Sequence, residues 1–522
     1  MTTIKSLVVS NFKKFPRLEL LFDEKRNILI GDNESGKSSV LLGIDLVLSG
    51  SRSKVETIGL ETLFHKTSVD NFLKGPKTFA NLPKLYIEAY LSDEKNPDLN
   101  GENNSKLIEC DGLRLDCEPI ADYSKDILEV LKHDQANFPF EFYLIKFTTF
   151  SGETYTGFRK FVKHLVLDSS QISNDYATRE YTKSVYSYNT SLIERSKHEN
   201  AYRMHKSTFR DGTLSDMNGK LATYKFGVRS GPKSNLESDI VITENGIPIE
   251  NKGKGKQCFI KTEFALQRNQ VENRLDLLLL EEPENHLSHG NMRRLVQKIS
   301  ESAEKQLVLA THSSLISSRL DLRKAIILSP HLSIATSLKD LDLDTANFFM
   351  KAPDNNVLEF VLSQKVLLVE GDSEFILLDA LYKTVSGGST LDADNVHVIS
   401  VDGTSFKRYL NLAKLLGIKT AAIRDNDSDY QKNCVENYDQ YVGENICVFS
   451  DQDNTRRTFE VCFYNDNKAV CDELFRAGRK TLSVLQYMLD NKTQVAFELL
   501  DKKGGELICP PHIQKAIEWI RG

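Results

Sequence analysis

The sequence of 522 residues lacks long apolar runs, and no stretch approaches the length that a bilayer span requires. Its opening residues, Met1 to Lys5, do not begin a secretory signal peptide. The eight cysteines are scattered and include no C-x-x-C pair, which argues against a metal cluster built on thiolates. Scattered cysteines in a large chain are typical of reduced thiols. These absences predict a cytoplasmic protein without a membrane partner.

A strong charge of either sign is also missing. The formal net charge is −6, from 67 basic and 73 acidic residues, which argues against a general binder of polyanions. Residues 346–522 hold 20 basic and 26 acidic residues, so subtraction leaves 47 of each in residues 1–345. The acidic C-terminal third is either a solvated surface or a set of carboxylates around cations, and its motifs favour cations for part of it. The length predicts two or three domains.

A glycine-rich loop at residues 31–39, with the sequence G-D-N-E-S-G-K-S-S, is the most informative motif of the N-terminal half. It follows an apolar run at 27–30 and precedes a helix-like stretch at 40–48. Gly31 and Gly36 let such a loop turn so that several backbone N–H groups point into one hollow. The N-terminus of the following helix adds its positive dipole end to that hollow, which suits a phosphate group.

The side chains of this loop complete a nucleotide site. Lys37 would reach the β- and γ-phosphates, and the Ser38 hydroxyl would contact Mg²⁺. ATP and Mg²⁺ are therefore the expected cofactors. The predicted ligands in the loop are Gly31, Asn33, Gly36, Lys37, Ser38 and Ser39.

Two apolar strands predicted further along the chain end in polar groups. The run L-D-L-L-L-L at 275–280 leads directly into Glu281 and Glu282, and the run at 306–310 ends shortly before His312. Beside a phosphate loop, the first carboxylate can hold Mg²⁺ and the second can orient an attacking water. A histidine at such a strand end can hydrogen-bond the γ-phosphate.

The remaining stretches of this half are less specific. Residues 4–22 predict two short strands, residues 92–137 are polar and predict a loop, and residues 169–235 predict an inserted subdomain or mobile arm. The loop N-K-G-K-G-K-Q at 251–257 precedes a helix-like stretch at 258–266. A loop of glycine and lysine before a helix is a second candidate anion cradle.

The order of these motifs resembles the ATPases of the ATP-binding-cassette (ABC) type, RecF- and SMC-like, that occur in DNA repair and chromosome maintenance. The opening Asn11-Phe12-Lys13, the phosphate loop, E-E-P-E-N-H-L from Glu281 and A-T-H-S-S from Ala310 are especially similar to the overcoming-lysogenization-defect (OLD) family. The resemblance implies that two heads dimerise and that the signature loop of one head caps the ATP bound to the other.

Carried over by position, the resemblance implies that Glu281 takes the metal-side Walker B position. It further implies that Glu282 is the catalytic glutamate and His312 the switch histidine. The signature loop at 251–257 departs from the family because it lacks the usual serine. Slow hydrolysis or an ATP-sensing role therefore fits the sequence as well as fast turnover does.

The C-terminal third predicts a small parallel α/β sheet, with strands at 365–369, 396–401 and 420–423 separated by helices. Its carboxylates follow the strands, at the edge where such sheets place their sites. They are Glu370, Glu374, Asp425 and Asp427. Oxygen ligands alone select Mg²⁺ or Mn²⁺, and two such ions suit in-line attack on a phosphodiester.

E-G-x-x-E followed by D-x-D across such a sheet resembles the Toprim domain of topoisomerases, primases and OLD nucleases. Residues 402–406 are similar to the glycine turn of that domain. The resemblance implies that Glu460 completes the second metal site and that a lysine near the site, Lys502 or Lys503, stabilises charge on the phosphorus. From sequence the choice between the two lysines is open.

These features predict an ABC-type ATPase head at 1–168 and 236–345, interrupted by a dimerisation or arm region at 169–235 and followed by a Toprim nuclease domain at 346–522. The predicted function is an ATP-regulated, metal-dependent DNA endonuclease of the OLD type. The expected partners are DNA and a second copy of the chain. The resemblance also implies a setting in anti-phage defence, with a partner protein or nucleic-acid element.

Two alternatives stay open. The chain could be an ATP-driven, DNA-binding sensor or scaffold whose Toprim site is catalytically weak. It could also be a Toprim ribonuclease that acts on RNA such as tRNA, because two metal ions cleave either backbone and no base-reading module is visible.

Overall fold

The computed structural model divides the chain into two compact units. The first unit comprises residues 1–316 and 328–335, and the second comprises residues 317–327 and 336–522. The strands β13 (Ala325–Leu328) and β14 (Ala335–Ser337) contain residues of both units. The residues described are 2–92, 95–132, 137–169, 175–229, 231, 234–266, 275–301, 305–313, 316, 320–328, 335–351, 356–401, 405–476 and 482–522.

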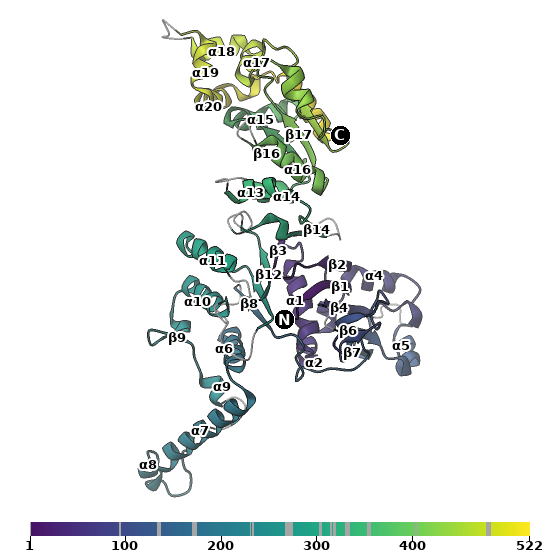
Figure 1. Ribbon diagram of the computed structural model, residues 1–522, viewed down its shortest axis with the longest axis vertical. Coiled ribbons are helices and arrows are strands. Elements are labelled where there is room, and N and C mark those ends of the chain that lie inside the picture. Colours follow the sequence, from purple (N-terminus) through teal and green to yellow (C-terminus); the bar gives the residue numbers. More distant parts are fainter. Residues whose placement is uncertain are drawn as a thin grey trace. The chain divides into compact units, whose positions relative to one another are not determined.

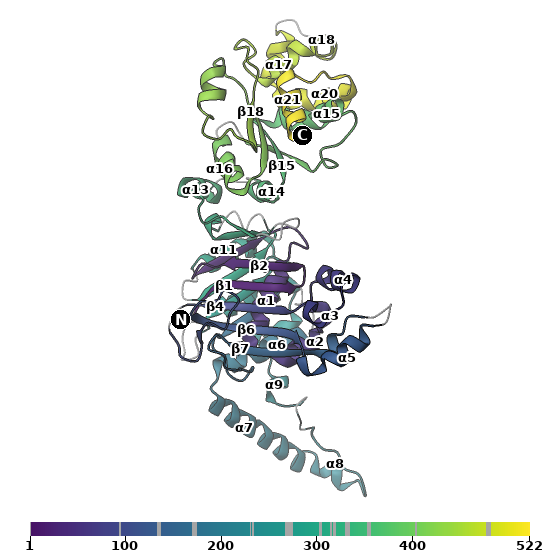
Figure 2. The same ribbon diagram turned by 90° about the vertical axis from the view of Figure 1, so that its right-hand side faces the viewer.

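The first unit contains an antiparallel sheet in the order β2-β1-β4-β6-β5, with β7 paired to β6, and Figure 2 shows its longer strands side by side. The two predicted opening strands are present, joined by a tight turn in which Lys13 has positive φ, as does Asn11 near the end of the first strand. The strand bounds are β1 Ile4–Phe12, β2 Phe15–Leu21, β4 Leu85–Leu91, β5 Asn100–Gly101, β6 Cys110–Pro119 and β7 Tyr143–Thr149.

The prediction of a loop over residues 92–137 is wrong for β6, which pairs with both β4 and β7. Leu113, Leu115 and Cys117 alternate along β6 with more polar residues and are buried. This is the period-two pattern of a strand. The pattern was hidden because polar stretches surround it on both sides.

A second sheet lies in the first unit, and four of its strands run parallel to one another in the order β3-β12-β11-β8. Their bounds are β3 Arg26–Ile30, β12 Gln306–Thr311, β11 Leu277–Glu281 and β8 His164–Asp168. The registers pair Ile30 with Thr311 and Glu281 with both Ala310 and Asp168. The carboxyl ends of all four strands therefore meet at one edge, and the phosphate loop follows β3 at that edge.

Helix α1 (Lys37–Ser49) begins where the phosphate loop ends and contacts strands of both sheets. Val40, Leu41 and Ile44 are among its buried residues, which explains why the predicted helix forms here. Shorter helices border the antiparallel sheet (Figure 1). They are α2 Arg52–Ile58, α3 Leu60–Leu63, α4 Lys66–Lys74 and α5 Ser124–Val130.

The predicted insertion is largely helical. It contains α6 (Asp175–Asn189), α7 (Leu192–Asp211) and α8 (Ser215–Gly219), and α9 (Leu236–Asp239) follows directly after its predicted end. Ser191 caps α7 through a reciprocal capping box with Glu194, but α7 has no buried residue. The unit continues with β9 Thr243–Glu244, β10 Ile247–Pro248, α10 Lys254–Leu266 and α11 His289–Glu301.

The second unit is built on a parallel sheet in the order β16-β15-β17-β18. The three predicted strands are β15 (Lys365–Val369), β16 (Val396–Ser400) and β17 (Lys419–Ile423). Sequence reasoning missed the fourth, β18 (Ile446–Phe449), because its four residues follow a polar stretch. The helices are α13 Leu343–Lys351, α14 Val357–Leu362, α15 Asp372–Ser386, α16 Phe406–Leu416, α17 Phe459–Asp466, α18 Lys468–Phe475, α19 Val484–Asp490, α20 Lys492–Lys503 and α21 Pro511–Arg521.

A continuous apolar core joins this sheet to its C-terminal helices. Leu367 and Val369 of β15 are fully buried with Leu377 of α15, Phe463 of α17 and Ile517 of α21. Burying side chains of this size contributes roughly 1.5–3 kcal/mol each. The core therefore fixes α15 and α17 against the end of β15, which is where the predicted carboxylates lie.

Candidate functional site

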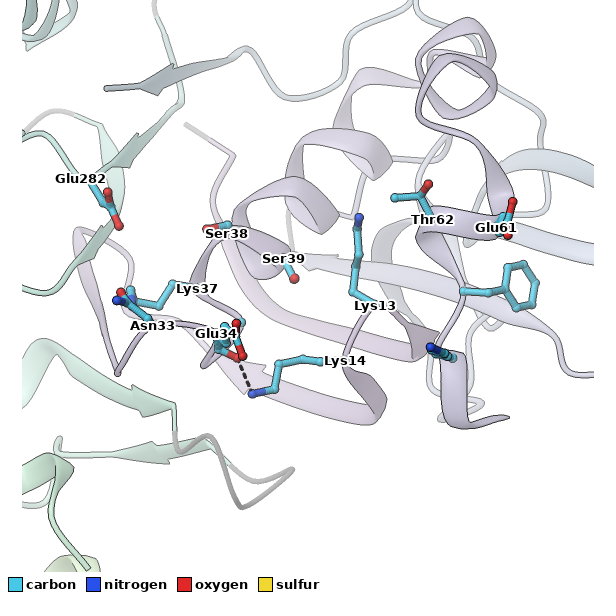
Figure 3. A pocket seen from close by; sticks show the side chains of 13 residues that line it. Lys13, Lys14, Asn33, Glu34, Lys37, Ser38, Ser39, Glu61, Thr62 and Glu282 are labelled. Atoms are coloured by element: carbon cyan, nitrogen blue, oxygen red, sulfur yellow. Dashed lines mark hydrogen bonds between the residues drawn. The ribbon is translucent and has the colours of Figure 1, made fainter. Parts of the chain in front are cut away.

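The phosphate loop lines a cleft of about 580 Å³ in the first unit, shown in Figure 3. Gly36 adopts φ 100°, and a Cβ at this position would lie 2.3 Å from the ring of Phe15. Only glycine tolerates both that conformation and that approach. The predicted ligands Asn33, Gly36, Lys37, Ser38 and Ser39 line this cleft together with Lys13, Lys14, Glu34, Glu61, Thr62, Phe64, Lys66 and Glu282.

Lys37 is buried, and its ammonium group bonds the backbone of the phosphate loop. The Nζ atom donates hydrogen bonds to the carbonyl oxygens of Gly31, at 2.6 Å, and Asp32, at 2.9 Å. Burial lowers the pKa of Lys37, whereas the charges of Glu282 and of neighbouring carboxylates oppose that shift. A phosphate would therefore offer this cation a stronger partner than the two neutral carbonyls that it has here.

Carboxylates gather at the edge of the parallel sheet beside this loop. Burial, followed by the charges of Asp168 and Glu282, raises the pKa of Glu281, whereas the Ser38 hydroxyl close to it acts in the opposite direction. A group of carboxylates next to a serine hydroxyl fits the oxygen ligands that Mg²⁺ takes. Asp168, missed from the sequence, ends the apolar run H-L-V-L-D in the way that Glu281 ends β11.

Glu282 and His312 meet across the ends of β11 and β12. The His312 Nδ1 atom lies 3.2 Å from Glu282 Oε1, and the other carboxylate oxygen of Glu282 accepts a hydrogen bond from the side chain of Asn285. Glu284, which sequence reasoning passed over, is buried and accepts from the backbone N–H of His312 and the hydroxyl of Thr311. Glu284 thus ties the two strand ends together and fixes where His312 lies.

The signature loop differs from its prediction in one respect. Helix α10 begins at Lys254, so residues 254–257 of the loop expected at 251–257 belong to the first turn of the helix. A Cβ on Gly255 would lie 2.1 Å from the carbonyl oxygen of His286, in the segment that follows Glu282. The start of α10 is therefore packed directly onto that segment.

The acidic motifs of the second unit converge on one place. Glu370 follows β15, Glu374 lies in the first turn of α15, Asp425 follows the neighbouring strand β17, and Glu460 is the second residue of α17. The backbone N–H of Asp425 donates to Glu370 Oε2 at 3.3 Å. Glu374 and Glu460 are only 6% and 4% exposed, and Glu370 and Asp425 are partly buried.

The acidic cluster, which consists of Glu370, Glu374, Asp425 and Glu460, carries an excess of negative charge. Burial first, then the charges of Glu460 and Glu370, raises the pKa of Glu374 to about 8. Burial and the other three carboxylates raise the pKa of Asp425 to about 9. Like charges at this spacing repel each other, and a divalent cation relieves the repulsion better than protons do. The donor set fits Mg²⁺ or Mn²⁺.

Asp427 lies at the border of the cluster rather than inside it. Its side chain is half-exposed, its φ is 48°, and its Oδ2 atom is 3.5 Å from the Arg424 guanidinium. Asp427 nevertheless raises the pKa of Glu370, although less than burial does. Between the two aspartates, the fully buried Asn426 donates to the carbonyl oxygens of Asp451, Asp453 and Arg456.

The lysine that contacts the acidic cluster is Lys492, at the start of α20. Its Nζ atom lies 3.0 Å from Glu460 Oε2, and its charge lowers the pKa of both Glu374 and Asp425. The two lysines named from the sequence have other partners: Lys502 pairs with Glu498, and Lys503 pairs with Glu473 and Glu506. No sequence motif marks Lys492, because its position depends on how α20 packs.

A second group of ligand-type side chains is formed by Asp451, Cys462 and His512, whose ligand atoms lie within 4.8 Å of one another. Arg456 neutralises this group by pairing with Asp451 and with Asp466, each at 2.6 Å. The arrangement therefore acts as an internal ion pair that joins α17 to the loop after β18. The first three residues of the predicted glycine turn at 402–406, residues 402–404, lie outside the described residues, as does Ser314 of the A-T-H-S-S motif.

The fold and the two sites define a P-loop ATPase of the ABC type joined to a Toprim domain. Residues 3–227 match the family described as "AAA ATPase domain", and residues 253–318 match a further AAA domain family. Residues 361–427 match the family described as "Overcoming lysogenization defect protein-like, TOPRIM domain". The resemblance to the OLD family drawn from the sequence is thereby confirmed.

Individual relatives cover parts of the chain. The Old nuclease of Escherichia phage P2 is 25% identical over 177 residues, which are 32% of this chain and 30% of that protein. The C-terminal region of the Xanthomonas campestris pv. campestris OLD protein is 23% identical, with a TM-score of 0.23 over 31% of this chain and 95% of that one. An Smc head domain from Pyrococcus furiosus is 14% identical, with a TM-score of 0.35 over 65% of this chain and 98% of that one.

Hydropathy adds one finding. Across the residues that the structure describes, none of the helices combines the length and the apolar character needed to cross a bilayer.

Proposed function

We propose that the protein is an ATP-regulated, divalent-metal-dependent DNA endonuclease of the OLD type. The observation that carries this proposal is the acidic cluster, in which four carboxylates from four elements are held together, with Lys492 in contact with Glu460 and Arg424 lowering the pKa of Glu370. Such repulsion costs stability unless cations are bound, so the arrangement is hard to explain as a structural feature alone. The matching relative named a nuclease supports the same activity.

Each residue then has a defined part. Glu370, Glu374, Asp425, Asp427 and Glu460 would hold two Mg²⁺ or Mn²⁺ ions, which when bound supply an activated water and stabilise the leaving oxygen. Lys492, at the border of the cluster, is placed to neutralise charge that develops on the phosphoryl oxygens. Asn426 keeps the two aspartates of the D-x-D motif in position through its bonds to the 451–456 loop.

The first unit would supply the control by ATP. Lys37 would bind the phosphates, Ser38 and Glu281 would hold Mg²⁺, and Glu282 with His312 would position water near the γ-phosphate. The ABC-type architecture supports a homodimer in which two heads close on ATP. We place the protein in the cytoplasm, in anti-phage defence, and expect it to act there with a partner protein or nucleic-acid element.

A plasmid assay tests the nuclease activity. Supercoiled plasmid is incubated with the full chain and Mg²⁺ or Mn²⁺, with and without ATP. Nicking or linearisation is expected, and Asp425→Asn should lower it by about 1,000-fold because a metal ligand is lost. Asp439→Asn, an exposed carboxylate in the same unit, is the matched control and should cut normally.

Two outcomes would contradict the proposal. If Asp425→Asn cuts as fast as the wild type, the acidic cluster is not the catalytic site. If no metal supports cleavage of plasmid but a structured RNA is cut, the substrate is RNA instead.

A further inference from the structure

The inserted helical region contains a segment whose charge differs sharply from that of the rest of the chain. From Met217 to Leu236 there is no aspartate or glutamate, whereas the segment carries Lys220, Lys225, Arg229 and Lys233. The whole chain has a net charge of −6, so this positive segment stands against an acidic background. Among the described residues, no carboxylate pairs with Lys220, Lys225 or Arg229.

The backbone of this segment is held in a defined loop after α8 (Figure 1). The Asn218 side chain bonds Phe226 in both directions: its Nδ2 atom donates to the Phe226 carbonyl at 2.9 Å, and its Oδ1 atom accepts from the Phe226 N–H at 2.8 Å. Two such bonds close residues 218–226 into a loop. We call residues 218–229 the tip loop.

The tip loop presents aromatic rings to the solvent instead of burying them. Tyr224 is 85% exposed and Phe226 is 58% exposed, on either side of Lys225. Each exposed ring forgoes the free energy that burying an aromatic side chain provides. Two exposed rings, carried on a loop that the Asn218 side chain closes, lie beside cations that have no carboxylate partner among the described residues. They therefore indicate a ligand that offers flat apolar faces and negative charge together.

Single-stranded nucleic acid has that combination. Its bases are free to stack on aromatic side chains, and its phosphates bind lysine and arginine. A duplex hides the faces of its bases, and a purely apolar protein surface would leave the three cations without partners. We propose that the tip loop binds single-stranded DNA, with bases stacked on Tyr224 and Phe226 and phosphates bound by Lys220, Lys225 and Arg229. This inference rests on the proposed nuclease function, because it names a contact surface for the substrate.

Binding can be measured without cleavage. The full chain carrying Asp425→Asn is titrated, without divalent metal, into a fluorescently labelled 20-nucleotide oligo-dT, and anisotropy reports the affinity. Adding Tyr224→Ala and Phe226→Ala together is expected to weaken binding by at least ~10-fold, because each stacked base is lost. Tyr224→Trp with Phe226→Trp should keep the affinity, since stacking surfaces remain. Lys225→Glu should weaken binding and reduce its dependence on salt.

Phe158→Ala is the matched control. Phe158 is fully exposed in the same unit, but the neighbouring Arg159 pairs with Asp98, so no unpaired cation is known beside it. This variant should bind oligo-dT as the parent protein does.

Three results would overturn the inference. The first is unchanged oligo-dT affinity in the Tyr224→Ala, Phe226→Ala variant. The second is a change in its sedimentation coefficient with unchanged affinity, which would mean that the tip loop docks a second copy. The third is tight binding of oligo-U but not of oligo-dT, which would assign the surface to RNA. The two proposals can fail separately. If the Tyr224→Ala, Phe226→Ala variant loses oligo-dT binding but the wild-type chain cuts no plasmid, the tip loop binds single-stranded DNA and the proposed endonuclease activity is contradicted.

Discussion

The two sites of this molecule use the same position in a parallel sheet in opposite ways. Both lie where strands end, with a helix N-terminus close by, but the first site surrounds a lysine and the second surrounds carboxylates. In the first, Lys37 is buried and turns to backbone carbonyls for partners. In the second, Glu374 and Asp425 are held beside two further acidic groups, and the charge of Lys492 only partly offsets them.

The difference indicates which ligand each site is built for. A buried ammonium whose hydrogen bonds go to neutral carbonyl oxygens gains from an anion in their place, so the first site suits phosphate. Carboxylates whose pKa values are raised by one another gain most from a cation, so the second suits divalent metal. The strand edge provides the geometry in both units, and the side chains that follow each strand decide the sign of the ligand.

The largest effect is expected at the anion site. Lys37→Ala should weaken ATP binding by at least ~100-fold, because a buried charged partner of the phosphates is removed. Lys14→Ala serves as the comparison within the same cleft and should have a smaller effect, since Lys14 bonds only the Glu34 carbonyl. Calorimetric titration with MgATP measures both. Equal MgATP affinities for the wild type and Lys37→Ala would contradict the inference that the first site is built for an anion.

The cation site is tested next through its lysine. Lys492→Met should slow plasmid cleavage by about 100-fold, as expected when one stabilising group is lost from a reacting phosphate. Lys503→Met should leave the rate unchanged, because Lys503 is engaged with Glu473 and Glu506. The measurement is the single-turnover rate at saturating Mg²⁺. If only Lys503→Met cleaves slowly, the stabilising lysine is Lys503, as predicted from the sequence, and not Lys492.

Proton binding should also distinguish the two units. Because the folded pKa values of Glu374 and Asp425, about 8 and 9, exceed the ordinary values, the folded state keeps protons that the unfolded state releases. Their contribution to stability is present below about pH 4 and is lost as the pH rises through 8 to 9, at about 1.4 kcal/mol per pH unit for each proton retained.

Urea unfolding in EDTA at pH 6 and pH 8.5 measures this loss for the transition of the second unit. Saturating Mg²⁺ should abolish this loss of stability between pH 6 and pH 8.5, since the metal replaces the protons. Asp425→Asn should reduce the loss, because one of the titrating groups is removed. A metal-free protein that is equally stable at both pH values would show that the carboxylates do not repel each other.

The smallest effect concerns packing beside the first site. Gly255→Ala forces a Cβ against the His286 carbonyl and should destabilise the first unit by roughly 1–3 kcal/mol, as overpacking does. Gly253→Ala is the control, because nothing lies within 4 Å of its Cβ position. Calorimetric scans of the two variants should therefore differ by several degrees. Matching melting temperatures would mean that α10 moves freely relative to the segment after Glu282.

Much of this architecture could be predicted from the sequence, because local patterns decide it. The apolar strands that lead into the phosphate loop, Glu281 and Glu370 formed where expected, since each is an unbroken buried run closed by a polar residue. The strand β6 and the start of α10 at Lys254 could not be predicted in the same way. Polar stretches on both sides obscured the alternating pattern of β6, and two glycines made the first turn of α10 resemble a loop in the sequence.

The candidate site residues show a similar limit. Glu370, Glu374 and Asp425 belong to short motifs on neighbouring strands, so their meeting follows from the sheet. Lys492 and Asp168 belong to no motif; the first reaches the cluster only because of how α20 packs, and the second only because β8 pairs with β11. Contacts between distant elements are set by tertiary packing, which spacing within one segment does not reveal.

The single amide group of Asn426 has a mechanical consequence. Its hydrogen bonds to Asp451, Asp453 and Arg456 join the end of β17 to a loop about 25 to 30 residues further along the chain. Because Arg456 in turn is paired to Asp466 on α17, a displacement of that loop is transmitted to both walls of the acidic cluster at once. The 451–456 loop thus couples β17 to α17, so a movement of this loop would change the distance between Asp425 and Glu460.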